Sequence, residues 1–171
     1  MRAALLGTRV VLLVLAASGC AGGAGVIVGL TSRTAIETEL ENWRDEIARA
    51  SVDEDVARSL RDVPPGAEVD VFLGTWCGDS RRVVARRFRA QEVAGEPLPF
   101  SIRFIGVDRS KVAPDGLTDG AQLRFVPTLV VRRGGVEVGR IVESAPRGVE
   151  TELRALLVGE TTGSISLRTD L

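Results

Sequence analysis

The chain has 171 residues, 44% of them hydrophobic and 26% charged, which suits one domain with a packed core plus an appendage. Its formal net charge of −1 gives no support to a nucleic-acid-binding protein. The sequence contains no histidine, so the usual general base and the commonest metal ligand are missing, and we propose neither a metal site nor a cofactor.

The first 19 residues resemble an export signal. Arg2 and Arg9 form a short basic region, and the apolar run over residues 10–17 has the length of a signal-peptide core. This pattern predicts that the rest of the chain lies outside the cytoplasm, on the periplasmic face or at the cell surface.

The tetrapeptide Ala-Ser-Gly-Cys at residues 17–20 is similar to a bacterial lipobox, with Ala17 where leucine is more usual. The resemblance implies a lipid anchor on Cys20, followed by a flexible tether over residues 20–33. Two alternatives stay open. Residues 10–30 carry no charge and could cross a bilayer as one helix, or the signal could be cleaved without lipidation.

Residues 34–61 have a helical pattern, with Ile36, Leu40, Trp43 and Ile47 at spacings of four, three and four. This spacing predicts Trp43 as a core residue. The pattern breaks near residue 51 and ends at the prolines that follow.

The next predicted elements alternate between strands and helices. They are a buried strand at 69–73, a helix at 80–93, a central strand at 100–107, a loop at 108–120 and a helical turn at 121–125. A hairpin of strands 129–132 and 136–142 follows, then a helix over 147–157. The order predicts an α/β sandwich with a mixed central sheet flanked by helices, spanning residues 34–158, with a disordered tail over 159–171.

Two short motifs occupy the junctions of these elements. Trp-Cys-Gly-Asp-Ser, residues 76–80, stands between the first strand and its helix, and Val-Pro-Thr, residues 126–128, precedes the hairpin. Over residues 34–157 the chain resembles the thioredoxin superfamily, which has Trp-Cys-Gly-Pro-Cys and Ile-Pro-Thr at these places, the proline being cis. The resemblance implies a thioredoxin-like fold, a reactive Cys77, and a substrate groove formed by Trp76, Val126 and Pro127. Trp76 could equally be a packing residue.

The position of Cys77 at a helix start favours its thiolate form, because unpaired N–H groups and the helix dipole attract negative charge. Arg81 and Arg82 add positive charge nearby, and Asp79 opposes it. Ser80, one turn along the helix, could donate its hydroxyl to the sulfur.

The chain departs from the superfamily pattern in ways that change the chemistry. Ser80 replaces the second cysteine, so Cys77 has no resolving partner in the motif, and a lipidated Cys20 could not supply one. Val71 replaces the buried aspartate of the family, and Asp79 replaces proline. These changes argue against a thioredoxin-type dithiol reductase.

We therefore expect a membrane-anchored monothiol protein in which Cys77 and Ser80 carry thiol–disulfide exchange or isomerisation. Its partners would be protein thiols or disulfides, or a small-molecule thiol. The first alternative is a redox-inert binding module that uses the same groove, and a structural lipoprotein is the second. Five arginines between Arg81 and Arg89 predict a solvated helix face or a docking surface for an acidic partner.

Overall fold

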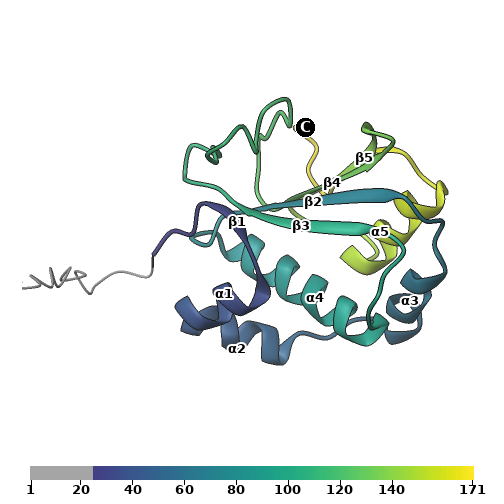
Figure 1. Ribbon diagram of the computed structural model, residues 1–171, viewed down its shortest axis with the longest axis horizontal. Coiled ribbons are helices and arrows are strands. Elements are labelled where there is room, and N and C mark those ends of the chain that lie inside the picture. Colours follow the sequence, from purple (N-terminus) through teal and green to yellow (C-terminus); the bar gives the residue numbers. More distant parts are fainter. Residues whose placement is uncertain (1–24) are drawn as a thin grey trace, which may run out of the picture.

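The computed structural model describes residues 25–171 (Figure 1). The predicted signal segment, Cys20 and the start of the tether lie outside these residues. In chain order the elements are β1 Gly29–Thr31, α1 Arg33–Glu39, α2 Glu41–Arg49, α3 Glu54–Ser59, the 3₁₀ turn η1 Leu60–Asp62, β2 Ala67–Leu73, α4 Gly78–Ala94, β3 Ser101–Gly106, β4 Thr128–Arg133, β5 Val136–Val142, α5 Val149–Val158 and β6 Gly163–Ile165. Over the described part of the chain, no helix combines the length and hydropathy that a membrane span requires.

The strands form one mixed sheet in the order β1-β3-β2-β4-β5-β6. β2 is parallel to β3 and β5 to β6, whereas the other neighbours are antiparallel. The predicted fold class, α/β with a mixed central sheet, is confirmed. β3 is second from the edge instead of central as predicted, and β1 pairs only with its last three residues, Phe104 to Gly106.

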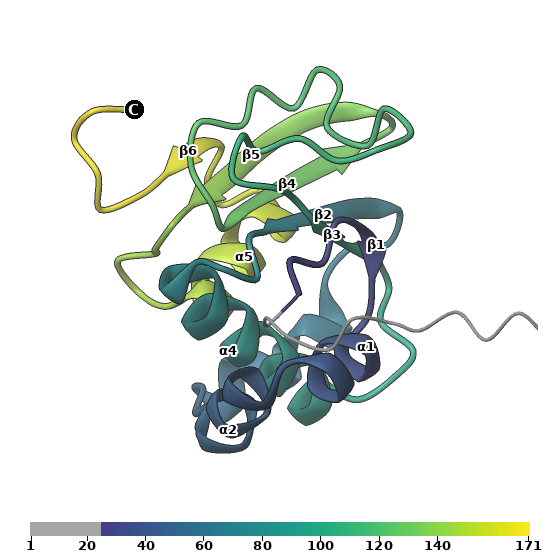
Figure 2. The same cartoon turned by 90° about the vertical axis from the view of Figure 1, so that its left-hand side faces the viewer.

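All five α-helices lie on one face of the sheet (Figures 1 and 2). Because neighbouring strand residues point to opposite faces, Val69, Val71 and Leu73 of β2 join the large apolar cluster under the helices. Phe72 joins a smaller cluster on the other face, under the irregular segment 107–127. The sequence did not predict this one-sided arrangement, which leaves the second face lightly covered.

The predicted helical region 34–61 is divided at two points. The break near residue 51 is confirmed, and Asp53 caps α3 by accepting hydrogen bonds from two backbone N–H groups. A second break at Leu40 was not predicted. Leu40 has an extended backbone (φ −129°, ψ 92°) and is buried, so its side chain packs in the core where the chain turns from α1 into α2.

Three further segments differ from expectation. Residues 121–125 contain no helical turn, and the guanidinium of Arg140 donates to the Ala121 carbonyl oxygen at 2.9 Å. Residues 159–171, predicted as disordered, include β6, which pairs with β5 because Gly139 allows the backbone of Gly163 to approach closely. The predicted tether includes β1, which completes one edge of the sheet.

Candidate functional site

Cys77 lies at the boundary between β2 and α4, where the sequence placed it. It is the N-cap residue of α4, with an extended backbone (φ −100°, ψ 123°). Its N–H donates to the Gly74 carbonyl oxygen at 2.9 Å, and its carbonyl oxygen accepts from the Arg81 N–H at 3.1 Å. The side chain is half-buried and carries a free thiol.

The thiol of Cys77 contacts the second motif directly. Its Sγ donates to the carbonyl oxygen of Val126 at 3.3 Å, across 49 residues of sequence. The peptide bond between Val126 and Pro127 is cis, as the resemblance implied, and Val126 is buried. The structure therefore brings together three of the predicted site residues: Cys77, Val126 and Pro127.

Ser80 does not take the predicted part. Its side chain is fully buried, and its Oγ accepts a hydrogen bond from the backbone N–H of Gly74 at 3.1 Å. In the described residues Cys77 Sγ is bonded to Val126 instead of Ser80. The hydroxyl thus ties the start of α4 to the end of β2, which corrects the expectation that it donates to the sulfur.

The residues around Thr75 hold the thiol loop, residues 74–77, in place. The indole N–H of Trp43 donates to the Thr75 carbonyl oxygen at 3.2 Å, and the N–H of Ile27 donates to Thr75 Oγ1 at 3.1 Å. Trp43 is fully buried, which confirms it as a core residue. Sequence reasoning missed Thr75, because its two partners are 32 and 48 residues away in the chain and no local pattern marks them.

Trp76 extends from the loop toward the lightly covered face. Its indole N–H donates to the Val107 carbonyl oxygen at 3.2 Å, and the guanidinium of Arg109 lies 5.1 Å from the ring centroid. A Cβ on Gly74 would lie 2.7 Å from the indole ring, so only glycine fits beneath it. Trp76 is therefore a packing residue with a partly exposed ring.

The positive charges predicted near Cys77 are matched by carboxylates. Arg82 forms an ion pair with Asp79, and Arg81 lies 3.8 Å from a Glu46 oxygen. Further along α4, Arg86 and Arg89 pair with Glu150 and Glu92. The prediction of a solvated arginine face is wrong for Arg87, which is fully buried. In these residues the run does not offer a free basic surface.

The position of the family's buried aspartate has an apolar environment here. Val71 is fully buried in the large cluster. The preceding residue, Asp70, faces the other side of the sheet, where its carboxylate accepts hydrogen bonds from Arg103 and Arg132. Across residues 25–171, no three His, Cys, Asp or Glu side chains are grouped to hold a metal ion.

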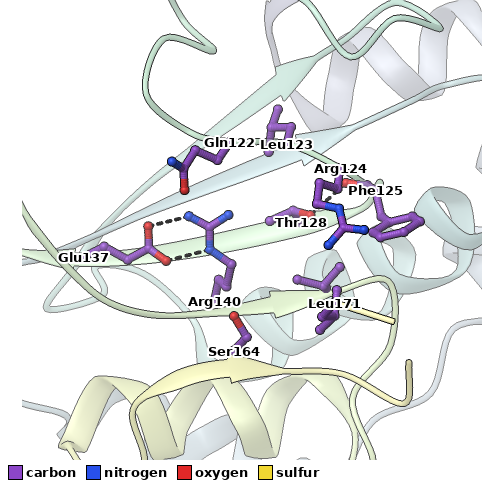
Figure 3. A pocket seen from close by; sticks show the side chains of 10 residues that line it. Gln122, Leu123, Arg124, Phe125, Thr128, Glu137, Arg140, Ser164 and Leu171 are labelled. Carbon is purple, nitrogen blue, oxygen red and sulfur yellow. Dashed lines mark hydrogen bonds and ion pairs between the residues drawn. The ribbon is translucent and has the colours of Figure 1, made fainter. Parts of the chain in front are cut away.

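A trough of about 830 Å³ lies over β4 and β5 on the lightly covered face (Figure 3). Its floor and walls come from the two strands, from segment 122–125 and from the last residues of the chain: Thr128, Glu137, Arg140, Val142, Gln122, Leu123, Arg124, Phe125, Ser164 and Leu171. Glu137 holds the Arg140 guanidinium through two hydrogen bonds of 2.6 Å. Because Phe125 precedes Val126, the trough begins one residue from the carbonyl that the thiol contacts.

Comparison with known proteins informs the fold alone. No family model matches the chain, and no curated protein matches it. The fold is similar to the crystal structure of a protein of unknown function from Pseudomonas aeruginosa, with a TM-score of 0.52 and 18% identity over 75% of this chain and 80% of that one. It is also similar to an HIV epitope-scaffold, with a TM-score of 0.51 and 18% identity over 78% and 86% of the two chains.

Proposed function

We propose that the protein is a membrane-anchored member of the thioredoxin superfamily and acts in thiol–disulfide exchange through Cys77 alone. The observation that carries this proposal is the thiol at the start of α4, which is half-buried and lies 3.3 Å from the Val126 carbonyl oxygen beside Pro127. A thiolate formed there lies at the N-terminus of α4, the end of a helix that stabilises negative charge.

The reaction would consist of two exchanges. First, the Cys77 thiolate attacks one sulfur of a disulfide R–S–S–R′, so that an S–S bond to Sγ forms and R′–S⁻ leaves with the electron pair. Then a second thiolate attacks the sulfur of R, forms a new disulfide with it and releases the Cys77 thiolate. The proton of the thiol passes to solvent beforehand. Since no net oxidation occurs, neither a cofactor nor an external oxidant is needed.

The second thiolate must come from outside the motif. Ser80 carries no sulfur, and its hydroxyl is buried against the Gly74 N–H. If the second thiolate belongs to the same substrate, the outcome is isomerisation, and if it belongs to a small-molecule thiol, the outcome is removal of the adduct.

The surroundings of the thiol suit an extended protein segment. The loop around Thr75 is fixed from two sides by Trp43 and Ile27, which keeps the sulfur in one place. The trough begins at Phe125 and provides both apolar and hydrogen-bonding groups along its length. A substrate chain with its cysteine at Cys77 could continue into this trough.

Trapping of mixed disulfides in the native host tests the proposal. Cysteine-blocked extracts of wild type, Cys77→Ala and Ser80→Ala would be run on non-reducing gels, and adducts would be identified by mass spectrometry. We expect adducts in the wild type, their loss in Cys77→Ala and their retention in Ser80→Ala, because the Ser80 hydroxyl is hydrogen-bonded to the Gly74 N–H and the thiol to Val126. If the wild type forms no adducts and Cys77→Ala retains the biological role, the redox-inert binding module is the better account.

A further inference from the structure

One edge of the domain exposes a row of aliphatic side chains. Val26, Val28 and Leu30 are 44%, 42% and 64% exposed, respectively. Between them, Ile27 packs against the core and Gly29 pairs with Gly106, so the row forms one continuous apolar side of the segment that leads into and forms β1. Aliphatic side chains that repeat in water along one side of a segment mark an interaction surface.

A groove of about 720 Å³ continues this apolar edge. It lies where β1 ends and leaves the first residues of β3 uncovered, between the sheet edge and α4. Leu30, Ile102, Phe88 and Phe104 supply its apolar lining. The two phenylalanine rings lie 4.7 Å apart and close its base.

The charged groups around this groove neutralise one another. Arg33 pairs with Glu37 at 2.8 Å and with Glu92 at 3.3 Å. Arg103 is bound by Asp70 on the neighbouring strand. The edge therefore offers apolar area without a strong field of either sign, which favours an uncharged apolar partner over an acidic or basic protein.

The short segment between the predicted anchor and this edge limits how far the edge can lie from the bilayer. Residues 10–24 carry no charge and lead directly into the exposed row. From Cys20 to Val26 the chain spans six residues, which fully extended reach at most about 20 Å. A domain anchored at Cys20 itself keeps the start of this edge, Val26, within that distance of the bilayer.

From this placement we propose that Val26, Val28 and Leu30, together with the adjoining groove, seat the domain in the apolar interface of the lipid bilayer. The occupant of the surface is the membrane itself. The inference rests on the anchoring stated under Proposed function and is independent of the thiol chemistry.

The seat also fixes the position of the thiol. Ile27, within the exposed row, donates its N–H to Thr75 Oγ1, two residues before Cys77. The sheet edge and the thiol loop are therefore joined by a direct hydrogen bond. A domain held by this edge presents Cys77 close to the membrane surface, so its partners would be cysteines of membrane proteins near the lipid headgroups.

Site-directed photocrosslinking of the full chain tests whether this edge contacts the lipid bilayer. Benzoylphenylalanine would replace Leu30 or, as the control, Val136, which is 69% exposed on the hairpin near the opposite edge of the sheet. The protein would be embedded through its own anchor in vesicles of phosphatidylethanolamine and phosphatidylglycerol that contain radiolabelled lipid. We expect position 30 to incorporate several-fold more lipid than position 136, at low and high salt alike, because the rim charges are paired.

Equal lipid incorporation at positions 30 and 136 in membrane-bound protein would overturn the proposed contact between this edge and the bilayer. Crosslinks from position 30 to a second protein would overturn it as well. If the protein does not bind the vesicles at all, both the anchoring and the contact between this edge and the bilayer are overturned. With benzoylphenylalanine at position 28, the substitution Leu30→Asp should reduce lipid labelling several-fold. The substitution Val136→Asp in the same background should not reduce it. Alkylation of Cys77, measured in the same samples, should be unchanged in both and reports separately on the thiol site.

Discussion

Two buried charged side chains on opposite faces of the sheet, Asp70 and Arg87, differ in how their charge is compensated. On the lightly covered face, Asp70 is 3% exposed and bonded to two guanidiniums, Arg103 on one neighbouring strand and Arg132 on the other. In the helical layer, Arg87 is fully buried, and its guanidinium has no hydrogen-bond partner among the described residues. The guanidinium carbon lies 5.8 Å from the centroid of the Phe100 ring.

The difference lies in the neighbours of each side chain, because helix packing pairs the buried carboxylate of Glu150 with Arg86 but leaves Arg87 without an acceptor. The register of β2 and β3 places Arg103 opposite Asp70, so the strand pairing itself positions the cation beside the carboxylate. Arg87 occupies a position on α4 surrounded by apolar residues, and its burial lowers its pKa to about 10 by desolvation, with Glu96 acting weakly against it. The charge of Asp70 is thus compensated, whereas that of Arg87 is not.

Removal of the compensated carboxylate should have the largest effect. Asp70→Ala leaves two guanidiniums without their shared acceptor, and we expect a loss of about 2–3 kcal/mol in the free energy of unfolding, less than for a fully buried pair because Arg103 is 53% exposed. Urea unfolding measures it. Glu68→Ala, on the same strand but exposed, is the matched control and should change stability by less than about 0.5 kcal/mol. Equal effects of the two variants would contradict the role assigned to Asp70.

Replacement of the uncompensated cation should instead stabilise the fold. Arg87→Met keeps a long side chain and removes the charge, and we expect the free energy of unfolding at pH 7 to rise by about 2 kcal/mol. Arg89→Met, on the more exposed side of α4, should change it little.

The gain from Arg87→Met should also depend on pH. Because the pKa of Arg87 is lowered to about 10 in the folded protein, the folded chain loses this proton above pH 10 while the unfolded chain still holds it. The unfolded state then binds more protons, so wild-type stability from this group rises with pH and the advantage of the variant shrinks. Unfolding curves at pH 8 and near pH 11 test the sign. A gap that widens above pH 10 would refute this account.

The smallest effect on stability is expected at Ser80, in the first turn of α4. Ser80→Ala removes the acceptor of the Gly74 N–H and should cost about 1 kcal/mol of stability. Because Ser80 Oγ is bonded to the backbone and not to the sulfur, the alkylation rate of Cys77 by iodoacetamide should stay within about twofold of wild type. A rate that falls by an order of magnitude would restore the sequence-based role of Ser80 at the thiol.

Local patterns in the sequence were sufficient for most of the elements. Apolar runs, a tight turn and helical spacing placed β2, β5 and α4 to within two residues. The resemblance carried by the two motifs implied a reactive Cys77 and a groove that includes Val126, and the structure has these two residues in contact. These features depend on neighbours in sequence or on a motif with a fixed geometry.

The features that the sequence did not predict depend on distant partners. β6 forms because β5 offers it an edge with Gly139, and nothing within residues 159–171 indicates a strand. The burial of Arg87 depends on the packing of α4, and an arginine in a run of five reads as solvated. The role of Ser80 was misassigned because helical spacing placed it near the sulfur, whereas its hydroxyl oxygen accepts from the N–H of Gly74.

The two indole bonds described at the thiol loop have a spectroscopic consequence. The chain contains two tryptophans and no tyrosine. Trp43 is bonded to the carbonyl of Thr75, and Trp76 belongs to the loop itself. Every indole in the protein therefore contacts the few residues that position Cys77. Intrinsic fluorescence, which in most proteins averages over many sites, is here a label-free optical signal from the loop where an adduct on Cys77 would form.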